Sequence, residues 1–304
     1  MGIRIRKISS YLPKKVVDNF YFEKILDTSD DWISSRTGIR QRHFVEDEGM
    51  MDLIKKAIGK LDLSQDEITR VKTIVVATCT AFHAIPNLAS QVQGEFNFGE
   101  DIYSLDINMG CSGFVAGLKL IEGMLKDGEY ALLIGAEVFS KVLDFEDRST
   151  VVLFGDGAGA VLLERSEKDS FFSSGTRGNK KVLNYGHDSD RLYMEGREVY
   201  KFAVSTVEKS IAKFLREIDI EIEDIDYFIS HQANIRMLES MAKGLGVSMD
   251  RFPANIDKVG NTSSASIPIL LDDMNREGGL KPGDRILMTG FGAGLTWVLA
   301  YMEW

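Results

Sequence analysis

Cys111 is the side chain in this sequence best placed to act as a nucleophile. It stands in DINMGCSGF (106–114), between a strand predicted near 102–107 and a helix predicted to begin near Ser112. The positive end of a helix dipole and free backbone N–H groups favour a thiolate at such a position. The small neighbours Gly110, Ser112 and Gly113 leave room for a substrate. An unpaired cysteine is also commonly a small buried hydrophobe, so Cys111 alone leaves both roles open.

Two further polar residues extend this chemistry. His231 follows an apolar strand in YFISHQAN (227–234), ahead of a helix expected to start near Asn234, and Asn261 stands in GNTSS (260–264) before an apolar helix. Sites in α/β folds gather outside the carboxyl ends of strands. Taken singly, His231 is explained as a hydrogen-bonded structural histidine and Asn261 as a helix cap. A cysteine with a distant histidine and asparagine, however, is the pattern of acyl-transfer enzymes.

The elements that position these residues are predicted to form a duplicated α/β chain. GEYALLIG (128–135) and GDRILMTG (283–290) share terminal glycines, an acidic second residue and an apolar strand, 155 residues apart. Segments 66–80 and 222–233 share a polar lead-in and an apolar run at a similar separation. Apolar strands alternate with amphipathic helices, predicted at 51–61 and 202–217, which indicates buried strands covered by helices. We expect two halves, 1–165 and 166–304; two unrelated α/β domains are the alternative.

The composition limits the possible functions. The chain has 304 residues and a net charge of −10, which argues against a general nucleic-acid surface because phosphates require clustered cations. We find no signal peptide and no apolar run long enough for a membrane span, and therefore expect a cytoplasmic protein that does not bind membranes. The two cysteines fit a reducing compartment, and Cys79, which ends a strand without a helix start beside it, is interpreted as structural. We expect no metal or cofactor, because no ligand cluster has the usual spacing.

Six motifs in a fixed order relate these residues to a known family. Over residues 3–304 the chain resembles β-ketoacyl-acyl-carrier-protein synthase III, the condensing enzyme that initiates type II fatty-acid synthesis. The motifs are DDWISSRTGIRQRH (30–43), GCSGF (110–114), DRSTVVLFGDGAGA (147–160), SHQANIR (230–236), GNTSSASIP (260–268) and GFGAGLTWV (290–298). The resemblance implies an acyltransferase that forms a homodimer. It also implies an α/β thiolase fold, in which two similar halves pack as a five-layered αβαβα sandwich.

The resemblance assigns a role to each candidate. Cys111 would take an acyl group from an acyl-CoA, which is a substrate, and His231 and Asn261 would assist decarboxylation of malonyl-acyl carrier protein. The backbone N–H groups of Cys111 and Ala293 would hold the tetrahedral oxyanion. A thiolase would bring a second catalytic cysteine from the C-terminal half, and this chain has no cysteine after position 111. Elongating condensing enzymes use two histidines where this chain has His231 and Asn261.

Further residues are implied at the substrate tunnel. Trp32 and Arg148 would lie on either face of the CoA adenine, because an indole and a guanidinium both stack on a purine. The other CoA-binding candidates are Thr28, Arg36 and Asn234. The candidates for carrier-protein docking are Lys201, Arg236 and Lys243, although Glu239 and Gly244 predict a weaker basic patch than the family's.

Two departures from the family bear on the acyl group. Ile85 in HAIP (83–86) occupies a position where a bulkier aromatic residue often closes the acyl pocket across the dimer interface. We hypothesise that the pocket admits primers longer than acetyl. The segment between Arg165 and Met194 is shorter than the family's and is expected to border the tunnel mouth.

The alternatives come from different classes of protein. One is a specialised relative that serves secondary metabolism or transfers an acyl group without decarboxylation. Another is a non-catalytic paralogue that binds a carrier protein. Cys111, His231 and Asn261 are all present, which favours condensation, but the sequence names neither the pathway nor the preferred acyl-CoA.

Overall fold

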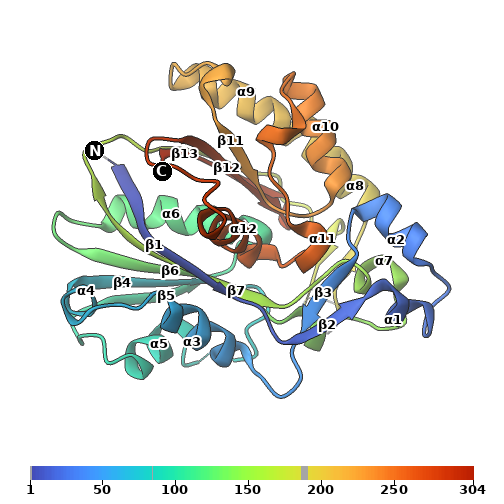
Figure 1. Ribbon diagram of the computed structural model, residues 1–304, viewed down its shortest axis with the longest axis horizontal. Coiled ribbons are helices and arrows are strands. Elements are labelled where there is room, and N and C mark those ends of the chain that lie inside the picture. Colours follow the sequence, from blue (N-terminus) through green and yellow to red (C-terminus); the bar gives the residue numbers. More distant parts are fainter. Residues whose placement is uncertain (1, 84, 186–190) are drawn as a thin grey trace.

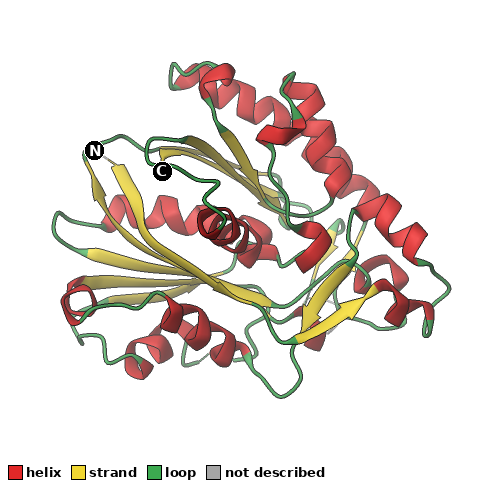
Figure 2. Cartoon of the chain, viewed as in Figure 1, coloured by secondary structure: helices red, strands yellow, loops and turns green. Residues whose placement is uncertain are grey.

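A computed structural model describes residues 2–83, 85–185 and 191–304. Two β-sheets lie one above the other, with helices between them and on both outer faces (Figures 1 and 2). The sequence prediction of a five-layered α/β sandwich is therefore confirmed. Among the described residues, none of the helices combines the length and the apolar character needed to cross a membrane.

The first sheet has five strands in the order β1-β7-β6-β4-β5. Its central strands pair in parallel, β4 with both β5 and β6, whereas β7 runs antiparallel to β6 and to β1. The bounds are β1 (Gly2–Tyr11), β4 (Val71–Ala77), β5 (Tyr103–Ile107), β6 (Tyr130–Glu137) and β7 (Gly157–Ser166). Every residue of β6 is buried, as expected of a strand covered on both faces.

The second sheet repeats the arrangement of four strands of the first, β1, β7, β6 and β4. Its order is β11-β12-β13-β8, with β11 and β12 parallel and the other pairs antiparallel. The bounds are β8 (Phe171–Thr176), β11 (Tyr227–Ser230), β12 (Arg285–Gly292) and β13 (Thr296–Glu303). The segments matched in the sequence occupy equivalent strands, since 128–135 leads into β6 and 283–290 into β12. The boundary between the halves, at residues 165 and 166, remains a prediction.

Two helices fill the layer between the sheets. These are α6 (Gly113–Met124) and α12 (Ser266–Arg276). Apolar side chains of both helices share one buried cluster with residues of both sheets, such as Leu133 of β6 and Met288 of β12. Each of the two helices begins just after a candidate site residue, so the central layer brings Cys111 and Asn261 towards each other.

The outer faces are covered by amphipathic helices. On the first sheet lie α3 (Met50–Lys60) and α5 (Leu88–Glu95), with α4 (Gln65–Arg70) leading into β4. On the second lie α9 (Glu208–Glu217) and α10 (Ile235–Leu245). Helix α3 matches the prediction at 51–61 to within one residue. The helix predicted at 202–217 is interrupted, because α8 (Gly196–Phe202) passes through a π-helical turn, Ala203–Val207, before α9 begins.

A group of short elements closes one end of the sandwich (Figure 1). It contains the elements β2 (Lys15–Asp18), α1 (Asn19–Glu23), α2 (Asp30–Thr37), β3 (Gln41–Phe44), α7 (Arg148–Val151), β9 (Leu183–Asn184), β10 (Tyr193–Met194) and α11 (Ile256–Val259). Of these elements, α7, β9 and β10 contribute residues to the wall of a central cavity.

Candidate active site

Cys111 lies in a tight turn at the carboxyl edge of the first sheet. Strand β5 ends at Ile107, a 3₁₀ turn covers Gly110–Ser112, and α6 begins at Gly113. Gly110 has a φ of 50°, a left-handed conformation that favours glycine. A Cβ at Gly113 would lie 3.1 Å from the Cβ of Ala77, so α6 can start this close to β4 only because residue 113 is small. The strand, turn and helix predicted around Cys111 are present.

The ionisation expected for Cys111 is wrong, however. Its side chain is buried, and this burial raises the thiol pKa to about 12, although a hydrogen bond from Ser263 and a backbone hydrogen bond both act to lower it. Desolvation penalises the thiolate, and the nearby Glu137 carboxyl acts in the same direction. Cys111 is therefore a thiol in the free protein and must lose its proton when it reacts.

His231 is held at the carboxyl end of β11. Its backbone N–H donates to the Thr289 carbonyl of β12, and its Nδ1 lies 2.7 Å from the hydroxyl of Ser266, the first residue of α12. The imidazole packs edge-on against Phe291 at a centroid distance of 5.5 Å. Burial lowers the pKa of His231 to about 3, so the ring is neutral at physiological pH and one nitrogen carries the proton.

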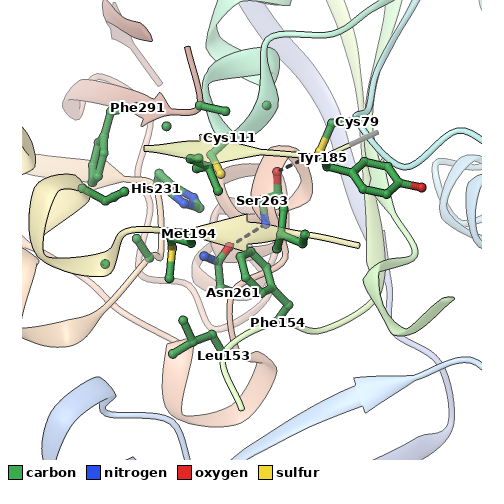
Figure 3. A pocket seen from close by; sticks show the side chains of 18 of the residues that line it. Cys79, Cys111, Leu153, Phe154, Tyr185, Met194, His231, Asn261, Ser263 and Phe291 are labelled. Atoms are coloured by element: carbon green, nitrogen blue, oxygen red, sulfur yellow. Dashed lines mark hydrogen bonds between the residues drawn. The ribbon is translucent and has the colours of Figure 1, made fainter. Parts of the chain in front are cut away.

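Asn261 is fixed by its backbone on one side and its side chain on the other. Its N–H donates to the Leu153 carbonyl, and its own carbonyl accepts from the N–H of Gly155, both at 2.9 Å. Its Oδ1 accepts the N–H of Ser263, also at 2.9 Å. Since the amide oxygen is engaged, the NH₂ group is the part of the side chain left to face the cavity, as Figure 3 shows.

The end of strand β12 lies directly against the nucleophile. A Cβ at Gly292 would lie 2.9 Å from the Cβ of Cys111 and 3.1 Å from its sulfur, a distance that real Cβ atoms rarely show. The next residue, Ala293, lines the same cavity, and its carbonyl accepts from the Thr296 hydroxyl at 2.9 Å. The Thr296 hydroxyl also lies 2.8 Å from that of Ser112. These contacts hold the 292–296 turn beside Cys111.

One cavity of about 450 Å³ joins these residues. Its wall is mostly apolar, and it includes Cys111, His231, Asn261, Ala293 and Asn234. Phe154 and Met194 lie close to the three polar groups in Figure 3. A largely apolar cavity with a few convergent polar groups is the usual form of a small-molecule site.

The segment between Arg165 and Met194 borders this cavity, as expected. Leu183, Tyr185, Leu192 and Met194 line it, on and beside the β9–β10 pair. Residues 186–190 of this segment lie outside the described residues.

The residues expected to bind CoA gather around α2. The guanidinium carbons of Arg36 and Arg148 lie over the Trp32 ring, each 4.7 Å from its centroid. A base stacked between the Trp32 ring and the Arg148 guanidinium requires these two planes to lie about 7 Å apart, which is twice the van der Waals contact distance. Arg148 therefore leaves no space for a base against this face of Trp32. Asn234 caps α10 and donates to the Arg36 carbonyl at 2.9 Å, and the Thr28 hydroxyl is a buried group without a hydrogen-bond partner among the described residues.

The remaining candidates lie outside the cavity. Lys201, Arg236 and Lys243 are exposed, on α8 and α10, and Lys201 approaches Glu198 at 3.9 Å. Ile85 is 87% exposed and is absent from the cavity wall of its own chain.

Several residues at the site were missed by sequence reasoning. Cys79, interpreted as structural, lines the cavity together with Cys111, and burial raises its thiol pKa well above the usual value. Ser263, Ser266 and Glu137 are buried polar residues next to the site. The only sequence signal for the two serines was the unusual polar run in GNTSSASIP, which is buried throughout.

Comparison with known proteins gives consistent matches over the chain. Residues 105–179 match the family described as 3-oxoacyl-(acyl-carrier-protein) synthase III, and residues 215–304 match the C-terminal part of the same family. A β-ketoacyl-(acyl-carrier-protein) synthase III of Clostridium acetobutylicum is 41% identical over 100% of this chain and 99% of its own length. The corresponding protein of Streptococcus suis is 42% identical over 97% of this chain and 96% of its own.

Solved structures show the same relation. The 3-oxoacyl-(acyl-carrier-protein) synthase III of Aquifex aeolicus superimposes with a TM-score of 0.92 at 38% identity, and the match covers 100% of both chains. The two-sheet arrangement described above is thus shared along the entire length.

Proposed function

The chain belongs to the β-ketoacyl-acyl-carrier-protein synthase III family, and from this premise we propose how its own residues perform the family's condensation. The reaction joins an acyl-CoA primer to malonyl-acyl carrier protein and gives a 3-oxoacyl-acyl carrier protein, which initiates type II fatty-acid synthesis. The observation that carries the proposal is the convergence of Cys111, His231 and Asn261 on one mostly apolar cavity.

The first step is acyl transfer to Cys111. The Cys111 sulfur attacks the carbonyl carbon of the acyl-CoA thioester and forms a new carbon–sulfur bond. The bond between that carbon and the CoA sulfur then breaks, and CoA leaves as a thiol that carries the proton lost by Cys111. The backbone N–H groups of Cys111 and Ala293 stabilise the tetrahedral oxyanion, because the turn at Gly292 holds residue 293 beside the sulfur. The thiol pKa near 12 means that proton loss must accompany attack rather than precede it.

The second step is decarboxylation of the malonyl group. Loss of CO₂ leaves an enolate, and its oxygen is stabilised by the Asn261 NH₂ group and by His231. The Ser266 hydroxyl, 2.7 Å from Nδ1, orients the ring, and the proposed role requires the imidazole proton on Nε2, where it is donated to the enolate oxygen. A neutral histidine suits this role, because it stays a donor without becoming a buried cation. The enolate carbon then attacks the acyl-cysteine, and the thiolate of Cys111 leaves and regains a proton.

Exposed residues are the proposed contacts with a second copy of the chain and with the carrier protein. A second copy of the chain would pack against edge strand β5 and the exposed side chains Phe82 and Ile85, which are 54% and 87% exposed. This arrangement would carry Ile85 to the acyl pocket of the partner. The acidic carrier protein would meet Lys201, Arg236 and Lys243 at the tunnel mouth.

The test of this function is a coupled product assay. Purified protein incubated with an acyl-CoA and malonyl-acyl carrier protein should release CO₂ and give a carrier whose mass matches the 3-oxoacyl product. Acyl transfer without CO₂ release, or binding of the carrier without either product, would favour the alternatives named from the sequence.

Substitution of Arg148 tests the CoA site. We expect Arg148→Ala to raise the KM for acyl-CoA by about tenfold, since the stacked guanidinium and its charge towards phosphate are both lost. The value of kcat should change little. Arg40→Ala is the matched control, because Arg40 is an exposed arginine beside α2 that pairs with Asp30. Equal effects of the two changes on KM would contradict the assignment.

A panel of primers tests the role of Ile85. With Ile85 at the acyl pocket, butyryl-, isobutyryl- and hexanoyl-CoA should support condensation at rates similar to acetyl-CoA. Ile85→Phe should reduce the rates with the longer primers by at least about tenfold relative to acetyl-CoA, because several methylene groups lose their space. A wild-type rate with acetyl-CoA far above all others would rule this hypothesis out.

A further inference from the structure

Arg42 is a buried cation in the group of short elements at one end of the sandwich (Figure 1). It lies on β3, its side chain is 0% exposed, and it takes no part in the reaction steps proposed above. Burial lowers the pKa of Arg42 to about 9, so the guanidinium still carries its charge at neutral pH. Removal of a charge from water is costly, and the contacts of the charged group must offset that cost.

The guanidinium is held by neutral oxygens and an aromatic ring. Its Nη1 donates to the Val17 carbonyl at 3.1 Å and to Asn19 Oδ1 at 2.9 Å. Its Nη2 donates to the Val152 carbonyl at 2.5 Å. The central carbon of the group lies over the Phe22 ring, 4.8 Å from the ring centroid. Because a guanidinium is a rigid planar fork, it fixes the partners of Nη1 and Nη2 relative to each other.

One partner of Nη1 leads to α2. Asn19 is buried, and its Nδ2 donates to Asp30 Oδ1 and to the Ile39 carbonyl, both at 2.8 Å. Asp30 is the first residue of α2, and Ile39 follows Gly38, the C-cap of the same helix. Asn19 therefore holds both ends of the helix that carries Trp32.

The partner of Nη2 leads to α7. Val152 is the C-cap of this helix, and the last carbonyls of a helix have no partner within it, so Arg42 supplies a donor there. Arg148, the first residue of α7, places its guanidinium over the Trp32 ring. Arg42 thus connects the two helices from which the proposed adenine-binding side chains project.

We propose that Arg42 is a positioning residue for the nucleotide of CoA, and that its guanidinium holds α2 and α7 in the relative position from which Trp32 and Arg148 bind the adenine. This inference rests on the proposed binding of CoA by those two residues. Arg42 itself is absent from the cavity wall, so it acts through the helices and not on the substrate. Asn261 is held by main-chain hydrogen bonds that involve no atom of Arg42. The loss on removing the guanidinium should therefore be confined to ligands that carry the nucleotide.

Two substitutions break this connection at different points. Arg42→Met removes the charge and leaves the carbonyls of Val17 and Val152 without this donor. Asn19→Asp keeps the oxygen that accepts from Arg42, but it replaces the donor to Asp30 by an acceptor that repels the Asp30 carboxylate. Arg42 then gains a charged partner, and only the link to α2 is lost. Asn19→Asp carries the test alone if Arg42→Met does not fold.

Arg251→Met is the matched control. The Arg251 guanidinium also donates to main-chain carbonyls, those of Ile222 and Ile225. It also lies over a phenylalanine ring, that of Phe228, at 5.3 Å from the centroid. These contacts lie near the amino end of β11, the end opposite His231, and Arg251 does not line the cavity. Its loss should lower stability without altering the nucleotide site.

The first measurement compares two primers in condensation, an acyl-CoA and the corresponding acyl-pantetheine, which has the same thioester but lacks the nucleotide. Arg42→Met and Asn19→Asp should each raise the KM for acyl-CoA by about fivefold, because misplacement of either helix weakens the stacking on adenine. The value of kcat should change little. Both kinetic constants for acyl-pantetheine should stay at the wild-type values, and Arg251→Met should match the wild type with both primers.

The second measurement is calorimetric titration with CoA, which needs no turnover. The dissociation constant of CoA should rise by the same factor of about five in both variants. An unchanged affinity for CoA in folded Asn19→Asp or Arg42→Met protein would overturn the proposal. An equal loss of activity with the two primers, or an equal rise of KM in Arg251→Met, would also overturn it, because general loss of structure would then be the cause.

Failure of the proposed function is distinguishable from these outcomes. Wild-type protein that binds CoA but gives no 3-oxoacyl product would contradict the proposed function, and the titrations would still decide the role of Arg42. Wild-type protein that binds CoA no more tightly than pantetheine would overturn the nucleotide site and, with it, the role of Arg42.

Discussion

Replacement of Cys111 by serine should abolish the covalent acyl-enzyme. Wild-type protein incubated with an acyl-CoA should gain the mass of one acyl group, and the Cys111→Ser variant should gain none. A serine hydroxyl is a far weaker nucleophile than a thiol and has no adjacent base comparable to that of serine hydrolases. Turnover in condensation should fall by at least about 10³-fold, the scale seen when a nucleophile is removed from an assembled site.

The second cysteine provides the internal control for this prediction. Cys79 lines the same cavity, but its thiol donates to the Glu137 carboxyl at 3.5 Å, and this contact opposes the negative charge that a nucleophilic sulfur develops. Cys79→Ser should therefore keep the acyl adduct. Equal labelling of the Cys111→Ser protein, or loss of the adduct in Cys79→Ser alone, would show that Cys79 and not Cys111 is the nucleophile.

Exchange of Asn261 for aspartate should stop decarboxylation while leaving acyl transfer largely intact. The substitution keeps the oxygen that accepts the Ser263 N–H and replaces the NH₂ donor by a second acceptor. An acceptor facing the enolate oxygen is repulsive, and removal of one such donor typically costs about 10²–10³-fold in rate. CO₂ release from malonyl-acyl carrier protein should fall by at least this factor.

The companion measurement is acylation of Cys111 in the same variant. The acyl adduct should still form, because Asn261 acts on the second substrate. Asn234→Asp is the matched control: Asn234 also lines the cavity, but its Nδ2 is engaged by the Arg36 carbonyl. Decarboxylation that survives Asn261→Asp, or that is lost equally in the control, would remove Asn261 from this role.

The local setting of each candidate could be predicted because it depends on short stretches of sequence. Gly110, Cys111 and the uncharged run after them specify a strand, a turn and a buried helix start. His231 follows its strand directly, and Asn261 precedes the helix that begins at Ser266. The two related octets at 128–135 and 283–290 predict equivalent strands, and β6 and β12 indeed occupy equivalent places, each between a parallel and an antiparallel neighbour.

The electrostatics of the site could not be predicted in the same way. A helix start favours a thiolate at Cys111, but burial of the side chain raises the pKa to about 12. The same burial makes His231 a neutral donor instead of a cation. Desolvation depends on every element packed around a group, and therefore on contacts between residues far apart in the chain.

The sequence by itself determined the fold class, the family and the identity of the three candidate residues, because motifs and periodicity are local in the chain. The tertiary structure alone decided which contacts connect these residues and their neighbours. The Ser263 hydroxyl lies 3.9 Å from the sulfur of Cys79, a residue more than 180 positions away, because the turn after Asn261 rests against β6 at Gly135. In the same way, Cys79 enters the cavity and Arg148 covers Trp32 through packing between distant segments. Such contacts form when the layers close, and no short stretch of the sequence encodes them.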